Sequence, residues 1–382
     1  MPNKVDPNLM EELQHYGMKD ATKCYQCGNC TAVCDLSTPE NPFPRKMVRY
    51  AQLGLKDKIM ESPEPWLCYY CGDCTAKCPR GAEPGETMMA MRRYLTAMYD
   101  WTGFAKKFYT SERFEIAAIA IVALLVGLGL LIFNTGHPNW EHAYINSVWP
   151  AEDIEIADIF MGSTLAFLLL TNVFRCFKYV MGDMASKVPF RMYKSEAKEL
   201  LVHVLTQKRF SGCSDKMQWY VHLAIMTGYA SVFLLVVGFI RWFQRDAEVY
   251  SIFHPVRLLG YYSTFAIMYG TTYAIIGRLK KSKPVYRHSH PTDWMFLILL
   301  QLTTMTGIII HFTRLLDLPL PTYFLYVIHM MVAIPMLVLE VPFAKWAHLA
   351  YRPVVIFLLK VKDRYRQEQT AASTAVVTEA AV

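Results

Sequence analysis

The chain has 382 residues, of which 53% are hydrophobic and 19% are charged. This composition excludes a disordered chain and is unusually apolar for a protein that is soluble over its whole length. The formal net charge of +7 does not indicate nucleic-acid binding, because the lysines and arginines gather in loops between apolar segments. Basic loops in such positions report the orientation of a membrane protein.

Two cysteine runs with the same spacing, Cys-x2-Cys-x2-Cys-x3-Cys, lie near the start of the chain. The first run contains Cys24, Cys27, Cys30 and Cys34, and the second contains Cys68, Cys71, Cys74 and Cys78. In two-cluster ferredoxins, three cysteines of each run bind one [4Fe–4S] cluster and the fourth binds the other cluster. We therefore predict one cluster on Cys24, Cys27, Cys30 and Cys78, and a second on Cys68, Cys71, Cys74 and Cys34.

Other interpretations of these cysteines are weaker. A disulfide framework needs an oxidising compartment, and the N-terminus has no signal-peptide pattern. Zinc sites commonly take their ligands as two separated pairs. The remaining cysteines, Cys176 and Cys213, are isolated, and we expect ordinary reduced thiols there. The first run departs from the ferredoxin pattern in one respect, since Asp35 and not proline follows its last cysteine.

We predict that residues 1–110 form a cytoplasmic helical ferredoxin domain. Few strand signals occur in this part of the chain, whereas residues 44–54 and 86–99 have helical patterns. In the second of these segments, Met88 and Met91 recur at helical spacing.

Six apolar segments that follow are each long enough to cross a bilayer. They cover residues 114–133, 157–177, 218–241, 256–277, 293–313 and 322–346. We therefore predict a transmembrane domain over residues 111–360, with a cytoplasmic loop at 178–217. For the Ala/Thr/Val/Glu-rich tail at 361–382 we expect disorder. The predicted fold class is all-α, a helical two-cluster ferredoxin domain followed by a six-helix transmembrane cytochrome b bundle.

The charge of the loops predicts the orientation in the membrane. Loops 178–217 and 278–291 are rich in lysine and arginine, whereas loop 134–155 contains neither residue. By the positive-inside rule, the two basic loops and both termini lie on the cytoplasmic side of the inner membrane. The histidines of the basic loops are expected to be solvated: His203, His288 and His290.

Four histidines of the predicted spans are candidate haem ligands, because an imidazole in hydrocarbon is expensive unless it is used. His222 and His348 are expected near the cytoplasmic side, and His329 and His311 near the outer side. Two b haems, each held by two of these histidines, would explain all four residues. His254 is an alternative to His311, and each histidine could instead only hydrogen-bond a neighbouring helix.

Three charged residues close to these histidines in sequence are candidate cofactor-binding groups. Glu340 lies between His329 and His348, where it is a proton carrier, a quinone-site group or a carboxyl kept neutral by burial. Lys345 and Arg352 flank His348, and they either pair with haem propionates or extend to the membrane surface.

With both halves in view, the chain resembles a fusion of two subunits of the heterodisulfide reductase system, the small iron–sulfur subunit and the cytochrome b membrane subunit. It is most similar to the quinone-interacting membrane-bound oxidoreductase family of sulfate-reducing bacteria. The resemblance runs from the cysteine runs to Pro-Phe-Ala-Lys-Trp-Ala-His-Leu at 342–349. That segment is similar to the Pro-Phe-x-Lys-x-x-His motif of the nitrate reductase gamma-subunit family, in which two b haems bridge the helices.

The resemblance implies a function in electron transfer. His329 and His348 match two histidines of that family's last helix, and His222 matches the inner histidine of its second helix. The outer histidine of that helix would fall near Val232, where this sequence has none. The resemblance implies exchange of electrons between menaquinone and flavin/iron–sulfur partner subunits, towards adenylylsulfate reductase. We therefore expect a quinone-interacting oxidoreductase subunit, active only in its complex and with no nucleic-acid partner.

Three alternative functions stay open at this point. A thiol–disulfide enzyme acting on a heterodisulfide would need spare cysteines, and only Cys176 and Cys213 remain. A non-catalytic anchor for a ferredoxin domain would leave the membrane histidines without a cofactor. A relay to a hydrogenase or another dehydrogenase would differ only in its partner surface.

Overall fold

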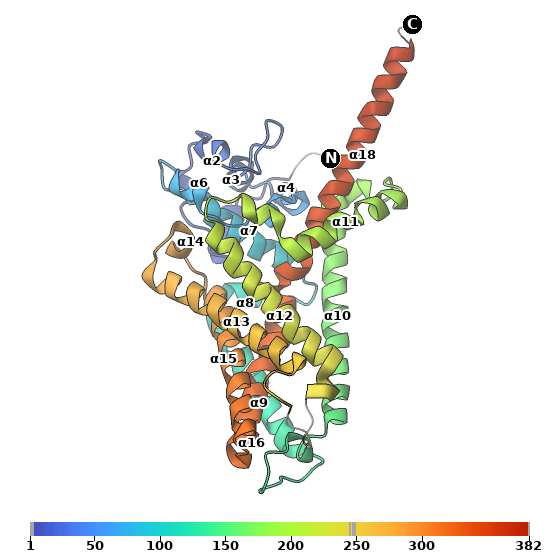
Figure 1. Ribbon diagram of the computed structural model, residues 1–382. Coiled ribbons are helices and arrows are strands. Elements are labelled where there is room, and N and C mark those ends of the chain that lie inside the picture. Colours follow the sequence, from blue (N-terminus) through green and yellow to red (C-terminus); the bar gives the residue numbers. More distant parts are fainter. Residues whose placement is uncertain (1–3, 244–245, 247–249, 381–382) are drawn as a thin grey trace. The chain divides into compact units, whose positions relative to one another are not determined.

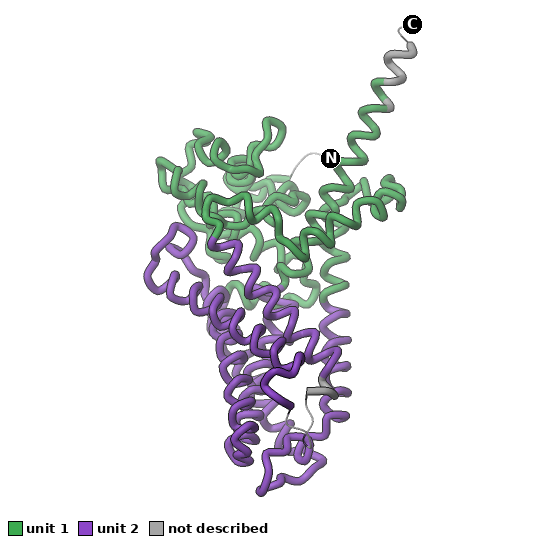
Figure 2. Tube along the Cα trace, viewed as in Figure 1, with its two compact units in different colours: residues 1–110, 169–216, 347–382 green, residues 111–168, 217–346 purple. Residues whose placement is uncertain are grey.

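The computed structural model describes residues 4–243, 246 and 250–380 of the chain (Figure 1). Figure 2 shows two compact units: unit 1 has residues 1–110, 169–216 and 347–382, and unit 2 has residues 111–168 and 217–346. The regular structure of both units is helical, and the described residues contain no strand. The predicted all-α fold class is therefore confirmed.

In unit 1, the helices of the first 110 residues are short with one exception. They are α1 (Leu9–His15), α2 (Asn29–Ala32), α3 (Arg45–Gln52), α4 (Lys56–Glu61), α5 (Glu64–Leu67), α6 (Asp73–Ala76), α7 (Pro84–Tyr99) and α8 (Phe104–Thr110). The long helix α7 contacts α1, α3, α5, α6 and α8 and is buried along nearly its whole length. The predicted apolar positions Met88 and Met91 are fully buried. Helix α7 is thus the centre of the cysteine-rich module, by which we mean residues 1–110.

Two later segments of the chain complete unit 1. Helix α11 (Phe190–Thr206) and the 3-10 turn at Lys208–Gly212 come from the basic loop, and α18 (His348–Ala380) is the last helix. Helix α18 packs against α11 and α5. Through these contacts both segments group with the cysteine-rich module, whereas the sequence analysis assigned residues 178–217 and 348–360 to the membrane domain.

In the tail, α18 continues to Ala380, and the expected disorder of residues 361–382 stays a prediction. The alanine, glutamine, glutamate and arginine residues of this tail have high helix propensity, whereas its valines and threonines have lower propensity. Arg364 also pairs with Glu368 one turn later at 3.3 Å.

The helices of unit 2 include most of the long apolar helices and one short helix. They are α9 (Glu112–Ile132), α10 (Ala151–Met181, whose later residues belong to unit 1), α12 (Lys216–Phe243), α13 (Pro255–Lys280), α14 (Pro284–Arg287), α15 (Pro291–Leu315) and α16 (Pro319–Pro335). Helix α16 packs against both α9 and α15, and α15 packs against α13 (Figure 1). One apolar cluster surrounds Tyr323 and Tyr326, and another surrounds Leu300 and Trp346.

Five helices in the described part of the chain are long and apolar enough to cross a membrane. They are Glu112–Ile132, Ala151–Met184, Lys216–Phe239, Pro291–Leu315 and Pro319–Phe343. The other predicted span, 256–277, falls in α13, which has 26 residues but is less apolar because tyrosine, threonine and glycine replace aliphatic residues. The structure therefore supports a membrane protein, and α13 as a sixth span stays a prediction.

The last predicted span, 322–346, is not one continuous α-helix. Helix α16 ends at Pro335 and is followed by a π-helical turn at Met336–Glu340, by α17 (Val341–Phe343) and by a 3-10 turn at Lys345–Ala347. Pro335 and Pro342 lack the backbone N–H that a regular helix needs, so the hydrogen-bond ladder is rearranged around them.

The close approach of α12 and α13 depends on glycine. A Cβ atom at Gly270 would lie 2.3 Å from Ile225 Cγ1 and 3.3 Å from the carbonyl oxygen of Val221. A Cβ atom at Gly260, in the same helix, would meet only Leu235 Cδ1 at 3.9 Å. The packing of α13 on α12 therefore has room for a methyl group at one glycine and not at the other.

We predict that Gly270→Ala destabilises the protein by about 1–3 kcal/mol, because the added methyl group forces α12 and α13 apart. Gly260→Ala is the matched control and should change stability by less than about 1 kcal/mol. Thermal unfolding of both variants in one detergent measures the difference. Equal melting temperatures for the two variants would contradict this packing.

Candidate iron–sulfur centre and membrane histidines

The two cysteine runs adopt the same backbone conformation. In each run, the second residue after the first cysteine has a positive φ, 61° at Gln26 and 57° at Tyr70. The glycine after the second cysteine has φ 90° at Gly28 and 89° at Gly72, a region that favours glycine because it has no Cβ. A short helix then begins, α2 in the first run and α6 in the second.

One group of sulfurs combines both runs around a pocket. Cys24, Cys27, Cys30 and Cys78 all line this pocket. The Cys30 thiol interacts electrostatically with the other three. Cys27 is exposed, so this group lies near the surface of unit 1.

A second group of sulfurs is more buried. The Cys34 thiol interacts electrostatically with Cys68 and Cys71, and the Cys74 thiol interacts with all three. Helix α2 packs against α6, which brings the last cysteine of the first run to the second run. Burial raises the pKa of the Cys34 thiol to about 12.

These two groups of four thiols suit [4Fe–4S] clusters, which cysteine thiolates hold. Among residues 4–243, 246 and 250–380, no three Cys, His, Asp or Glu side chains stand close enough to hold a single metal ion. A cubane has a wider reach than one ion, because each thiolate binds a different iron. The neighbours of each thiol agree with the predicted grouping, and the ligand assignment itself stays a prediction.

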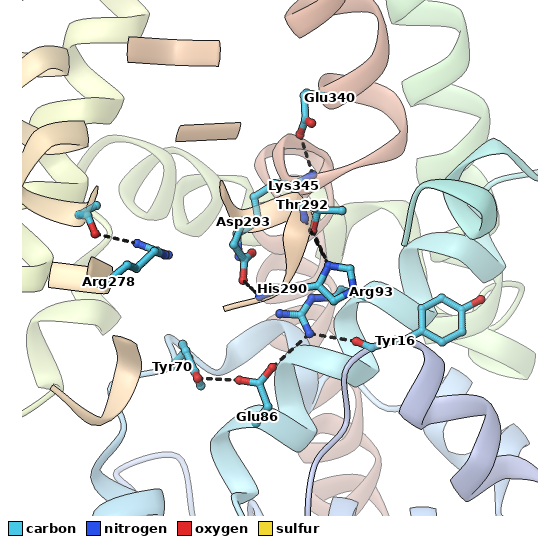
Figure 3. A network of polar contacts seen from close by, with 11 residues as sticks. Tyr16, Tyr70, Glu86, Arg93, Arg278, His290, Thr292, Asp293, Glu340 and Lys345 are labelled. Carbon is cyan, nitrogen blue, oxygen red and sulfur yellow. Dashed lines mark hydrogen bonds and ion pairs between the residues drawn. The ribbon is translucent and has the colours of Figure 1, made fainter. Parts of the chain in front are cut away.

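Buried polar contacts from α7 hold the second run in place (Figure 3). Tyr70, inside this run, donates its hydroxyl to Glu86 Oε2 at 2.6 Å. Arg93 pairs with Glu86 Oε1 at 3.2 Å and donates to the carbonyl oxygen of Tyr16 at 2.9 Å. Because the charges of Arg93 and Glu86 are paired and hydrogen-bonded in the interior, breaking either side would leave a buried charge uncompensated.

Two buried arginines converge on the backbone of Cys68. Arg352 from α18 donates to the carbonyl oxygens of Trp66 at 2.9 Å and Cys68 at 2.6 Å. Its guanidinium lies 4.3 Å from the ring centre of Tyr69. Arg92 from α7 donates to the same Cys68 carbonyl. Burial, together with the positive charge of Arg352, lowers the pKa of Arg92 to about 9.

Arg352 and Lys345 therefore have partners that the sequence analysis did not foresee. It placed both residues beside haem propionates or at the membrane surface. The structure engages Arg352 with a carbonyl 284 residues earlier in the chain, and Lys345 forms an ion pair with Asp293. A pairing over such a separation leaves no local signal in the sequence. A role of either residue beside haem propionates stays a prediction.

The basic loop packs over the second cysteine run within unit 1. His203 is buried, against the expectation of a solvated loop residue, and its ring nitrogens lie 3.2 and 3.3 Å from the Tyr69 hydroxyl. Tyr69 stacks on Phe210 with ring centres 4.7 Å apart. Ser214 donates its hydroxyl to Asp73 at 2.6 Å. These contacts tie both ends of the segment 203–214 to the cysteine-rich module.

The histidines that were predicted near the outer side of the membrane, together with His254, have different surroundings in unit 2. His329 Nδ1 hydrogen-bonds Thr306 Oγ1 at 2.9 Å. His311 Nε2 hydrogen-bonds the Tyr261 hydroxyl at 2.8 Å. His254 stacks on a tyrosine ring, and its buried Nδ1 meets no hydrogen-bond partner in the described part of the chain.

A histidine that binds a metal commonly engages its other ring nitrogen in a hydrogen bond, which fixes the ring. His329 fits this pattern, because Thr306 holds Nδ1 and leaves Nε2 for iron. The pairing of His329 with His311 or His254 stays a prediction. His222 and His348 belong to different units, so their pairing stays a prediction as well.

Comparison with known proteins bears on the cysteine-rich module. Residues 23–83, which include both cysteine runs, match the family described as a 4Fe–4S dicluster domain. A protein of Archaeoglobus profundus that is like the C-type subunit of heterodisulfide reductase is 33% identical over 97 residues, which cover 25% of this chain and 52% of that protein. The C-type iron–sulfur subunit of the CoB–CoM heterodisulfide reductase of Methanopyrus kandleri is 29% identical over 126 residues, 31% of this chain and 61% of that protein.

The C-type subunit of the H2:CoB–CoM heterodisulfide,ferredoxin reductase of Methanothermobacter marburgensis is 36% identical over 64 residues, 16% of this chain and 34% of that protein. The alignment with the Archaeoglobus relative thus spans about half of that relative's length. No solved structure gives a significant match. The module is therefore similar to the iron–sulfur subunits of oxidoreductases, and the prediction of [4Fe–4S] clusters is supported.

The prediction that each cluster takes one cysteine from the other cysteine run can be tested directly. Cys34→Ser is expected to lower the iron content from about eight to about four atoms per chain, with loss of the second cluster. Cys176→Ser, at the cysteine that hydrogen-bonds Tyr99, is the matched control and should keep both clusters. Iron analysis with electron paramagnetic resonance of the reduced protein measures this. Loss of the first cluster in Cys34→Ser, with the second retained, would contradict the shared arrangement.

The burial of His203 predicts a pH dependence of stability. Burial, then the charges of Arg352 and Arg209, lowers the pKa of His203 to about 4 from an ordinary value of about 6.5. The unfolded chain therefore binds the proton more readily, and stability should fall as the pH drops from about 6.5 towards 4.

In His203→Gln this contribution should be absent, so its melting temperature should fall less than that of the wild type between pH 7 and pH 5. The exposed His15 supplies the control, since His15→Gln should follow the wild type. Melting curves that shift equally in all three proteins would refute this role.

Proposed function

We propose that this chain is the membrane electron-transfer subunit of an oxidoreductase complex. It passes electrons between a quinone of the menaquinone type and cytoplasmic flavin/iron–sulfur partner subunits, through haem b and two [4Fe–4S] clusters. The observation that carries this proposal is the presence, on one chain, of a 4Fe–4S dicluster domain and five helices apolar enough to cross a membrane. Such a chain connects electron carriers dissolved in the membrane with carriers in water.

Haem b, when bound, supplies one-electron chemistry inside the apolar helices, and the chain supplies ligands, burial and spacing. His329, with its ring fixed by Thr306, is the best supported ligand. His254, whose buried Nδ1 meets no partner among the described residues, and His311 are candidates for the opposite ligand. His222 and His348 are the proposed ligands of a second haem.

The two cysteine groups differ in exposure, and this difference suggests where electrons leave the chain. Cys68 is 8% exposed, whereas Cys27 lies open to solvent. We infer that the group containing Cys27 exchanges electrons with the soluble partner, because electron transfer needs close approach. Adenylylsulfate reductase as the final partner, and the inner membrane with cytoplasmic termini as the location, are proposed from the sequence alone.

One observation favours a second candidate, thiol–disulfide chemistry. The Cys213 thiol hydrogen-bonds Cys71, so a fifth sulfur lies at the second cysteine group. The other spare cysteine, Cys176, is fully buried and hydrogen-bonds Tyr99. Cys176 is thus not placed to act beside Cys213. We rank this candidate second, and reduction of a small disulfide by wild type but not by Cys213→Ser would favour it.

The cytochrome part is tested by a reduced-minus-oxidised spectrum and a haem-to-protein ratio. The wild type is expected to bind a pair of b haems, and His329→Ala is expected to lose one of them. Between His254→Ala and His311→Ala, the variant of the true opposite ligand should lose the same haem. His137→Ala, at an exposed loop position, is the control and should keep both.

Menaquinol should reduce haem and clusters in the wild-type protein and fail to do so in His329→Ala. A wild type without haem would contradict the cytochrome assignment and leave an anchored ferredoxin. A wild type whose haem is not reduced by menaquinol would contradict the quinone assignment.

A further inference from the structure

Two carboxyl groups are buried together inside unit 2. Glu115 lies in the first turn of α9, and Glu340 ends the π-helical turn that follows α16. Both side chains are 0% exposed. The two carboxyl groups interact electrostatically with each other, and α9 contacts the π-helical turn. The sequence analysis singled out Glu340 but gave no role to Glu115.

Neither carboxyl group has the partners that a buried charge needs. Among the described residues, no group outside the pair donates a hydrogen bond to Glu115 or to Oε1 of Glu340, and the two carboxyl groups hydrogen-bond each other. Glu340 Oε2 accepts only a long hydrogen bond, 3.4 Å, from the backbone N–H of Lys345. An unpaired carboxylate is very costly in an apolar interior, and two adjacent carboxyl groups cannot both be ionised.

The surroundings of the pair are otherwise apolar. Ile119, one turn after Glu115, and Leu337 and Val341, beside Glu340, pack on the cluster that contains Met336. The charged groups that face the pair are Glu112 from α9, Asp293 from α15 and Lys345. One lysine therefore faces several acids, so the pair holds at least one proton.

A chain of polar groups leads away from the pair (Figure 3). Lys345, whose side chain is 29% exposed, donates to Glu340 through its backbone and forms an ion pair with Asp293 through Nζ. Asp293 Oδ2 in turn accepts the backbone N–H of His290 at 3.3 Å. The backbone of Lys345 thus contacts the buried carboxyl group of Glu340, while its partly exposed side chain pairs with Asp293. π turns are frequent at functional sites, and here one carries Glu340.

We propose that Glu115 and Glu340 share a proton and form the proton-transfer site for quinol oxidation in unit 2. This inference rests on the proposed quinone function. Oxidation of one quinol releases two electrons and two protons. Bound haem and clusters would take up the electrons. One proton is taken up by the ionised carboxyl group of the pair, and the other proton is released to water.

Infrared difference spectroscopy of the full-length protein with its cofactors tests the site. Menaquinol-reduced minus oxidised spectra should contain a band of a protonated carboxyl group. This band should be lost in Glu115→Gln and Glu340→Gln. It should persist in Glu152→Gln, a control at an exposed position of α10.

Rates separate the proton site from the electron path. Cluster reduction by menaquinol should be roughly a hundredfold slower in Glu340→Gln, the loss expected when an acid–base group is removed. Reduction of the same variant by dithionite should be unchanged, which shows that the clusters and the fold are intact. Glu115→Gln provides a second variant should Glu340→Gln fail to fold.

The outcomes distinguish the two proposals. If menaquinol reduces the wild type but the carboxyl band is absent, or is present in both variants, the proton site is refuted and the quinone function stands. If menaquinol does not reduce the wild type while dithionite does, the quinone function fails and the proton site fails with it. Loss of band and rate in both variants, with the control unchanged, supports the proton site.

Discussion

The carbonyl group of Cys68, held by two buried arginines, is the constraint on which the rest of unit 1 depends. Arg92 reaches it from the central helix α7 and Arg352 from the last helix α18, so both helices meet at one backbone atom. Hydrogen bonds from charged donors are about twice as strong as neutral ones, but the two guanidinium groups repel each other. Their positive charge is offset by the nearby sulfur of Cys68 when it is a thiolate. The fold of the module and the charge of the second cysteine group are therefore coupled, and a cluster there would be favoured in its more negative, reduced state.

Unit 2 differs from the cysteine-rich module in how its buried charged side chains are partnered. In the cysteine-rich module the buried charges of Glu86 and Arg93 are paired and hydrogen-bonded, as a rigid scaffold for electron transfer requires. Among the membrane helices, Glu115 and Glu340 are buried with few partners, which is expensive unless one proton stays bound. The paired charges of Glu86 and Arg93 thus lie in the module whose atoms should stay fixed. The weakly partnered acids Glu115 and Glu340 lie among the helices where a proton can move.

The sequence predicted what depends on local spacing. The cysteine runs follow from a spacing of about three residues, and the helical class follows from the 3.6-residue period of apolar positions. The five apolar spans follow from uninterrupted apolar stretches of about twenty residues. All three patterns can be read from the sequence without knowledge of the fold. The burial of Arg352 and His203 was not predictable, because their partners lie far away along the chain. Glu115 was missed because an acid in the first turn of a helix is an ordinary N-terminal residue. The break after Pro335 was missed because the hydrophobic pattern of the last span runs through it.

The contact of Arg352 with Cys68 also has a consequence for biosynthesis. The ribosome completes the cysteine-rich module long before it reaches α18, which lies 284 residues further on. Every apolar helix must enter the membrane in between. Until α18 is synthesised, only Arg92 can hydrogen-bond the Cys68 carbonyl group. A chain whose membrane insertion is interrupted would therefore have an incompletely closed loop around Cys68.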